Sequence, residues 1–165
     1  MRANAKMFLG KRAAAVAMVA LVGLGLSACG FANTSASGPS DPLISAMYQA
    51  LNQDRAANGL PPLTWSPKLQ NSAGTWSNQM ANDNSLHHQN LGALISGPDY
   101  SGYNTLGENI LDGPGNMTAA QMEAAWMASP PHRANITSGN FNIVGIGVYW
   151  GPDGRIWATV DFGGI

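Results

Sequence analysis

Two apolar runs separated by a tight turn, near the C-terminal end of the sequence, constrain the fold most strongly. The runs are NIVGIGVYW (142–150) and RIWATVDF (155–162), and GPDG (151–154) stands between them. Every second residue around Ile146 is apolar in the first run, and every second residue around Ala158 in the other. Alternation of this kind on both sides of a Gly/Pro/Asp turn is typical of an antiparallel β-hairpin. We therefore expect this part of the chain to form two paired strands.

Two helices are predicted in the first half of the domain from their start and stop signals. Asp-Pro at 41–42 and Ser-Pro at 66–67 each place a capping side chain before a proline, which is well tolerated in a first helical turn. Asn-Gly at 58–59 should stop the first helix. Apolar residues at helical spacing should carry the second helix to about Asn82.

A third predicted helix follows a segment with few signals for regular structure. Residues 83–115 are rich in Asn, Gly, Ser, His and Pro, and only LGENIL (106–111) favours a short strand. Thr118 and Gln121 then form a capping box, and the Pro-Pro pair at 130–131 ends the helix and restarts the chain as a short helical turn. Three helices followed by a hairpin predict an α+β domain, with helices packed against an antiparallel sheet.

The first 28 residues have the pattern of an export signal. Four basic residues precede an uncharged, mostly apolar run of 14 residues, Ala13 to Leu26. A membrane span needs about 20 residues, so this run is too short for one. It leads into Leu-Ser-Ala-Cys at 26–29, which resembles the bacterial lipobox, where the cysteine is lipidated and becomes the first residue. Cys29 is the only cysteine, and lipidation accounts for a thiol that would otherwise be reactive in an exported protein.

These features divide the chain into three parts. Residues 1–28 are the predicted lipoprotein signal peptide, 29–40 a small, polar, flexible tether, and 41–165 one domain of ordinary size. The alternative is an ordinary cleavage site followed by a chance cysteine. Lipid on Cys29 would anchor the domain to the cell membrane on its extracytoplasmic face, which makes the membrane the first expected partner.

The charge balance argues against nucleic acid as a partner. All nine acidic residues but only four of the eight basic ones follow Cys29, which leaves the mature chain with a net charge of about −5. Binding to phosphate backbones requires clustered Lys and Arg. The sequence leaves a small apolar ligand or an envelope protein as further partners, and we expect the domain to be a monomer.

Three histidines and one glutamate are the best candidates for chemistry. His87, His88 and His132 stand beside turn-like sequence, and Glu108 lies in GEN. Two histidines and a carboxylate are a ligand set that Zn²⁺ or another divalent metal accepts, so His88, Glu108 and His132 are candidate metal ligands. Their long spacing, without an HExxH-like pair, makes the pattern unspecific. Ser129, three residues before His132, is a candidate nucleophile, but no GxSxG elbow surrounds it.

Each candidate also has a purely structural interpretation. The loop histidines would then be solvated, and Glu123 would be solvated on the third helix. Glu108, Asn109, His132 and Arg133 would form a hydrogen-bonded clasp that ties two irregular loops to the sheet. Such a network stabilises a fold, because each hydrogen bond contributes about 1 kcal/mol.

Several stretches, taken in order, resemble the CAP superfamily of cysteine-rich secretory proteins, antigen five and pathogenesis-related proteins. They are NQDRAANGLPPLTW (52–65), SLHH (85–88), GENI (107–110), WMASPPHRANI (126–136) and the two runs of the hairpin. The match is to the compact, cysteine-poor bacterial branch and covers about Leu43 to Gly163. It implies an α-β-α sandwich with a central antiparallel sheet. It also implies a surface cleft with two histidines and two glutamates, which in some members binds a divalent metal such as zinc.

Residue by residue, the resemblance fills only part of that cleft. His88, or the histidine before it, matches the family histidine after the second helix, and Glu108 matches the glutamate of GENI. Ser129 stands where animal and plant members carry the second glutamate, and Ile156 stands where they carry the second histidine. His132, in the SxxHR pattern typical of the bacterial branch, would fill part of that vacancy from another loop.

The incomplete set of cleft residues bears on function. Without a second carboxylate, no separate general base stands beside a metal-bound water. With the lipobox, this favours a membrane-anchored, extracytoplasmic binding or interaction module without catalysis. One alternative is a metal-dependent hydrolase acting on cell-envelope or peptide substrates, with His88, Glu108 and His132 as ligands or base. Another is a domain whose His/Glu clasp is purely structural and which interacts through other surfaces.

Overall fold

The computed structural model of the protein describes residues 38–165. The predicted signal peptide, Cys29 and the tether up to residue 37 lie outside the described residues. No helix within 38–165 has the length and apolar character that a membrane crossing requires. The elements are α1 (Pro42–Ala57), β1 (Thr64–Trp65), α2 (Pro67–Asp83), α3 (Leu91–Ile95), the 3₁₀ helix η1 (Pro98–Tyr100), β2 (Thr105–Pro114), α4 (Ala119–Ala128), α5 (Pro130–Ile136), β3 (Ile143–Trp150) and β4 (Arg155–Gly164).

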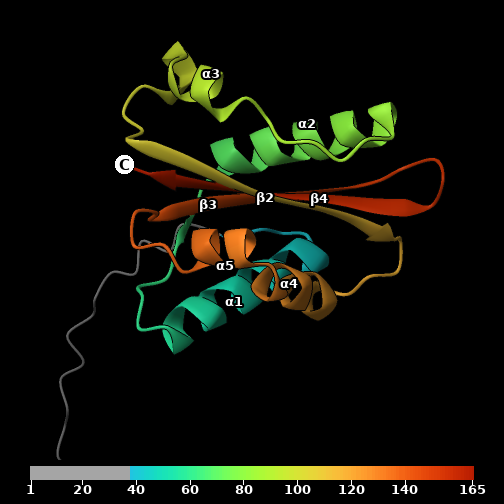
Figure 1. The fold of residues 1–165 in the computed structure, drawn as a ribbon, viewed down its shortest axis with the longest axis horizontal. Helices are drawn as coiled ribbons and strands as arrows, with labels where there is room; N and C mark the ends of the chain where they lie inside the picture. Colours follow the sequence, from blue (N-terminus) through green and yellow to red (C-terminus); the bar gives the residue numbers. More distant parts are fainter. Residues whose placement is uncertain (1–37) are drawn as a thin grey trace, which may run out of the picture. The chain divides into compact units, whose positions relative to one another are not determined.

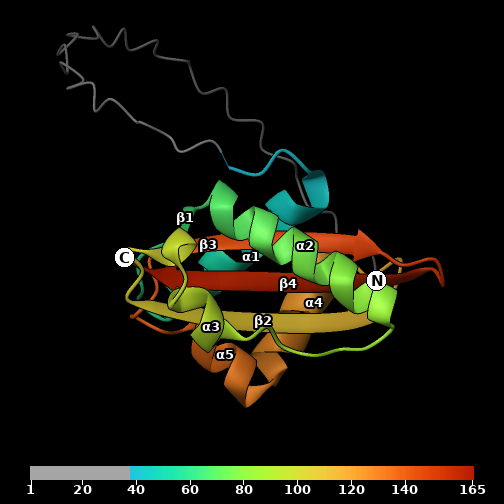
Figure 2. The ribbon, with the colours of Figure 1, turned by 90° about the horizontal axis from the view of Figure 1, so that it is seen from above.

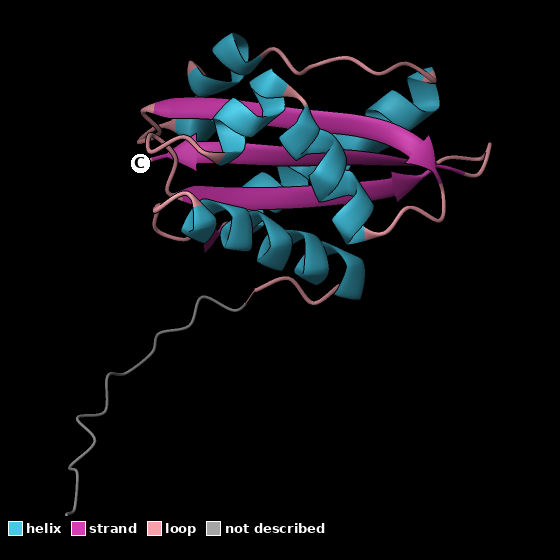
Figure 3. Cartoon of the chain, turned by 60° about the horizontal axis from the view of Figure 1, so that its bottom comes forward, coloured by secondary structure: helices cyan, strands magenta, loops and turns pink. Residues whose placement is uncertain are grey.

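Helices cover both faces of a single sheet, as Figures 1 and 3 show. α2 and α3 lie on one face, and α1, α4 and α5 lie on the other. Figure 2 looks onto the first face, where α2 runs along β3 and β4. The predicted α+β class and its α-β-α sandwich are therefore confirmed.

The sheet has the strand order β1-β3-β4-β2. β3 and β4 form the predicted hairpin, and β2 pairs antiparallel with β4 over its ten residues. The predicted central antiparallel sheet consists of β3, β4 and β2, and the short β1 extends it at one edge by pairing in parallel with β3. This short strand lies where the chain passes from α1 on one face of the sheet to α2 on the other, and its backbone hydrogen-bonds to the edge strand β3.

The predicted helix boundaries agree with the structure. Asp41 and Ser66 accept backbone N–H groups of the first turns of α1 and α2 at 3.0 and 3.3 Å. Thr118 and Gln121 form the capping box of α4. The Pro-Pro pair at 130–131 separates α4 from α5, because a proline in a helix interior would remove a backbone hydrogen bond.

The segment 83–115 carries more regular structure than the sequence predicted. It holds α3, η1 and a β2 that is four residues longer than the predicted 106–111 strand. The side chain of Asn90 caps α3 by accepting the N–H of Ala93 at 3.0 Å. The extra length of β2 comes from pairing with β4, a long-range interaction that local composition does not reveal.

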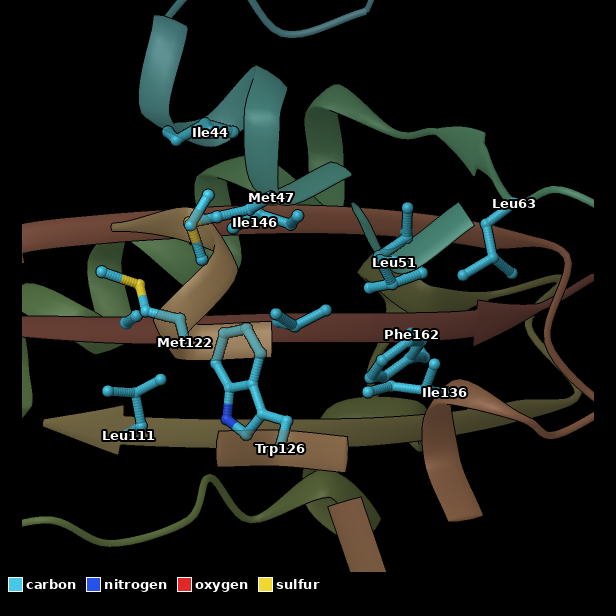
Figure 4. Close-up of a cluster of buried hydrophobic side chains, with 14 of the residues drawn as sticks. Ile44, Met47, Leu51, Leu63, Leu111, Met122, Trp126, Ile136, Ile146 and Phe162 are labelled. Carbon is cyan, nitrogen blue, oxygen red and sulfur yellow. The ribbon is translucent and has the colours of Figure 1, made fainter. Parts of the chain in front are cut away.

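The main apolar core lies between the sheet and the face carrying α1, α4 and α5 (Figure 4). Trp126 is 1% exposed and donates its indole N–H to the carbonyl of Ile110 at 3.2 Å. Burial of such side chains is the largest favourable contribution to folding. The labelled members of this core are Ile44, Met47, Leu51, Leu63, Leu111, Met122, Trp126, Ile136, Ile146 and Phe162.

On the opposite face, α2 packs directly against the backbone of β3. A Cβ atom at Gly145 would overlap the backbone at Gln70, and one at Gly147 would overlap the backbone at Gly74. Ser77, also on α2, donates its hydroxyl to the carbonyl of Gly147 at 3.1 Å. The two glycines of the first hairpin strand therefore set how closely α2 approaches the sheet.

Arg55, near the end of α1, is completely buried and faces backbone carbonyls instead of a carboxylate. Its Nε donates to Pro61 O at 3.0 Å, and its Nη2 donates to Phe141 O at 3.2 Å. Its Nη1 donates to the carbonyls of Ile136 and Ser138 at 2.9 and 2.8 Å. Burial lowers the pKa of Arg55, but four hydrogen bonds hold the guanidinium in place. This side chain ties α1 to the connection between α5 and β3.

Replacing Arg55 should destabilise the domain strongly. Arg55→Gln leaves several buried carbonyls without donors, at about 1–3 kcal/mol for each unsatisfied group. We expect urea unfolding to show a loss of about 3 kcal/mol or more. Arg133→Gln is the matched control, because Arg133 is exposed and makes one long bond of 3.4 Å. Equal stabilities of the two variants would contradict the role assigned to Arg55.

Candidate functional site

A histidine and a glutamate form a close pair between β2 and the chain that follows α2. His88 Nδ1 lies 2.6 Å from Glu108 Oε1. The side chain of Glu108 is 1% exposed, whereas that of His88 is 58% exposed. The backbone N–H of Gln89 donates to the same Glu108 oxygen at 3.1 Å. The pair therefore presents an imidazole to solvent and keeps the carboxylate inside.

A second buried carboxyl lies beside this pair. Asp161 on β4 is the cross-strand partner of Glu108 and is 4% exposed. The Gln89 side-chain nitrogen donates to Glu108 Oε2 at 2.8 Å and to Asp161 Oδ1 at 3.0 Å. The Ser72 hydroxyl on α2 reaches the Gln89 side-chain oxygen at 3.4 Å. One amide side chain thus bridges two adjacent carboxyl groups.

The environment of Asp161 favours its neutral form. Burial raises its pKa to about 7, and the negative charge of Glu108 adds to this effect. The polar side chains of Ser72 and Gln89 lower the pKa and offset only part of the rise. A carboxyl that remains largely protonated close to neutral pH avoids placing two negative charges side by side.

His132 approaches the pair from the other side of the sheet edge, on α5. Its backbone carbonyl accepts the side-chain N–H of Asn109 at 3.0 Å, and Asn135 donates to the Asn109 side-chain oxygen at 2.9 Å. Burial lowers the pKa of His132, and the charge of His88 lowers it further. Asn109 and Asn135 thus connect β2 to α5 through the backbone carbonyl of His132. The His132 ring takes no part, and Arg133, the other predicted member, bonds to the carbonyl of Met127 instead.

The residues proposed as metal ligands do not form a three-ligand set in this geometry. Within residues 38–165, no three His, Cys, Asp or Glu side chains are grouped so that they could hold a metal ion. Both oxygens of Glu108 and the Nδ1 of His88 are engaged with the protein's own groups. Ligation of Zn²⁺ through Glu108 or through the Nδ1 of His88 would compete with these hydrogen bonds, whereas no hydrogen bond engages the Nε2 of His88 within residues 38–165.

The other candidates lie apart from the His88–Glu108 pair. His87 Nδ1 is 2.9 Å from the carbonyl of Ser85, and its ring packs edge-on against Trp76. Ser129 sits at the junction of α4 and α5, where its side chain makes no capping hydrogen bond to α5. Ile156 is completely buried in the apolar core.

Sequence reasoning missed Gln89 and Asp161. A signal for Asp161 was present, because Trp157, Thr159 and Asp161 occupy every second position of the last run, on the face opposite Ile156. An acid at the end of that row indicates a polar layer on the second face of the sheet. Gln89 had no comparable signal, since a loop glutamine is ordinary in sequence.

Comparison with known proteins assigns the chain to a protein family. The model of the cysteine-rich secretory protein family, CAP, matches residues 48–162. The protein YkwD of Bacillus subtilis (strain 168), itself uncharacterized, is 35% identical over 139 residues, which are 79% of this chain and 52% of that protein. The chain thus spans about half the length of this curated relative.

Solved structures share the fold at lower identity. An outer surface protein of Borrelia burgdorferi superposes with a TM-score of 0.64 at 19% identity, covering 78% of this chain and 98% of that one. An extracellular protein of Bacillus anthracis that contains an SCP domain gives a TM-score of 0.61 at 24% identity, over 78% and 45% of the two chains. The family match covers most of the chain, and the fold agrees with it: the protein belongs to the cysteine-rich secretory protein (CAP) family.

Proposed function

We propose that this chain is an exported, lipid-anchored binding domain that works on the extracytoplasmic face of the cell membrane without catalysing a reaction. The proposed anchor is Cys29 within the lipobox-like Leu-Ser-Ala-Cys sequence. Similarity to an extracellular Bacillus protein and a Borrelia outer surface protein supports export.

The engagement of Glu108 is the observation that carries the non-catalytic part of the proposal. His88 and two donors of Gln89 occupy the carboxylate, which is buried. A general base must reach the proton it removes, and a metal ligand must offer a free lone pair. Glu108 is too deeply buried to reach a substrate, so we assign the His88–Glu108 pair a structural role and call it the His/Glu clasp. The metal-dependent hydrolase receives no support from this arrangement.

An open groove beside the clasp supports a binding role. Its volume is about 390 Å³, and it runs along α2 opposite α3 and η1. Trp76 provides an aromatic wall, while Asn71 and Thr75 provide hydrogen-bonding side chains. Aromatic surface with a few polar groups is typical of a ligand-binding groove.

Glu108→Gln and His132→Ala separate the clasp from a metal site. If Glu108 is structural, Glu108→Gln should lower the free energy of unfolding by about 1–3 kcal/mol, because the charge facing His88 is lost. His132→Ala should change it little, since the ring makes no hydrogen bond to any residue from 38 onward. Elemental analysis after dialysis against Zn²⁺ should find less than one equivalent in each protein. The proposal would be overturned if the wild-type protein held one equivalent of Zn²⁺ tightly and turned over a peptide or cell-wall substrate, and if both variants lost the metal.

Cys29→Ser tests the anchor. In the producing bacterium, the wild-type chain should incorporate a labelled fatty acid and sediment with membranes, whereas the variant should do neither. Ser35→Ala in the tether should behave like the wild type. Membrane association of unlabelled Cys29→Ser protein would show that something other than lipid on this residue holds it.

The buried carboxyl of Asp161 makes a prediction about pH. Its pKa rises from 3.8 to about 7 on folding, so the folded state holds a proton that the unfolded state has released in this window. This contribution to stability is therefore present below about pH 4 and is lost as the pH rises towards 7. Asp161→Asn should flatten the fall in melting temperature across that range, whereas Asp83→Asn, at an exposed site, should not. An unchanged pH profile in Asp161→Asn would contradict the assignment.

A further inference from the structure

A third buried acid lies on the opposite face of the sheet, and no basic side chain lines the hollow beside it. Glu123 on α4 is 5% exposed, although the sequence suggested a solvated position. Neither of its carboxyl oxygens has an N–H or hydroxyl donor among residues 38–165, and the group beside them is the carboxyl of Asp54 on α1. Burial raises the pKa of Glu123 to about 8, and the neighbouring carboxyl of Asp54 on α1 contributes to this rise. A buried polar group without a partner costs about 1–3 kcal/mol, so this position is costly for the fold alone.

Glu123 and Asp54 line an open hollow between α1 and α4. Its volume is about 310 Å³. Three alanines and a methionine provide an apolar wall, and Gln53 adds an amide. No Lys, Arg or His is among the lining residues, which are Ala50, Gln53, Asp54, Ala120, Glu123, Ala124 and Met127. The hollow therefore combines an apolar wall with two carboxyls that no cation among its lining residues compensates.

We propose that this hollow binds an alkylammonium group, with Glu123 and Asp54 receiving the ammonium and the alanine wall receiving the alkyl chain. An ammonium has three N–H donors and no acceptor, which suits a cluster of carboxylate oxygens. Glu123 is largely protonated near neutral pH, so the bound ammonium would displace this proton to solvent and take its place between the two carboxyls. The hydrogen bonds formed in this way join ionised groups and are about twice as strong as neutral ones. The group is either the side chain of a lysine in a partner protein or a free amine.

Other ligand classes suit the hollow less well. Calcium takes six to eight oxygen ligands, whereas two carboxyls and one amide line this hollow. An anionic head group, such as a fatty carboxylate, would meet the negative charge of Asp54 and no cation among the lining residues. The hollow lies between α1 and α4, on the sheet face opposite α2, whereas the His88–Glu108 pair joins β2 to the chain that follows α2. A failure of this proposal would therefore leave the proposed function intact.

Titration of the full chain with n-butylammonium tests the site. Butanamide and butanoate have the same carbon chain with a neutral and an anionic head, so they isolate the contribution of the charge. We expect butylammonium to shift the amide NMR signals of residues around Asp54 and Glu123, and the two analogues to leave them in place. Equal shifts with butanamide would mean that the hollow accepts only an alkyl chain and would overturn the proposal. So would the absence of any shift up to the solubility limit of the amine.

Two variants connect the binding to its residues. Glu123→Gln should weaken binding about tenfold or more, because it removes a charge-assisted hydrogen bond. The same variant should be at least as stable as the wild type, since it removes a buried acid, so lost binding cannot be attributed to unfolding. Asp54→Asn should also weaken binding, and Asp83→Asn, at an exposed site on α2, should leave it unchanged. Wild-type affinity in Glu123→Gln would refute the assignment.

A lysine-containing tripeptide, acetylated and amidated at its ends, distinguishes the two sources of the group. If a partner protein supplies the ammonium, the peptide should bind more tightly than butylammonium, because its backbone adds contacts at the rim. If the ligand is a free amine, the peptide should bind more weakly than butylammonium. Peptide binding that survives Glu123→Gln would place the contact elsewhere and count against the hollow.

Discussion

The close contact between α2 and β3 sets the plan of the whole domain. Gly145 and Gly147 have no side chain on the face they turn to α2, so the helix lies against the strand backbone. Their neighbours Val144 and Ile146 point the other way, into the apolar core. The sheet therefore has one face built from large apolar side chains, whereas on the other face α2 takes the place of side chains at these two glycines. Period-two alternation in a strand makes such a division possible.

This division explains where the polar chemistry of the domain lies. With α2 so close, its Ser77 reaches Thr159 at 2.9 Å, and the segment that follows the helix brings Gln89 to Asp161. Thr159 and Asp161 find partners within this layer, whereas the buried indole nitrogen of Trp157 has none among residues 38–165. On the other face, the core under α1, α4 and α5 is almost wholly apolar, so Glu123 at its margin has no comparable partner.

Signals local in sequence predicted the fold well, and contacts between distant segments were harder to predict. Caps such as Asp41 and Ser66 act within one helical turn, and the hairpin forms around its own turn, so their positions could be read directly. Glu108 was identified by its motif. Arg55 was not, because its four acceptors lie on connections that only the folded chain brings together. The predicted exposure of Glu123 was wrong, because the pattern of apolar residues in one helix does not show which other helix will pack against its polar side.

The two buried carboxyls outside the GENI motif differ in how the fold treats them. Asp161 has a raised pKa, but the Gln89 amide binds it and ties it to Glu108, so its proton and its hydrogen bonds are accounted for within the chain. Glu123 has a raised pKa and no such amide, and it borders an open hollow instead of a sealed layer. A buried polar group that the fold satisfies contributes to stability, whereas one that it leaves unsatisfied lowers stability until a partner arrives. Asp161 is in the first situation and is tied to the His/Glu clasp. Glu123 is in the second situation, where a ligand would supply the hydrogen bonds that the fold does not.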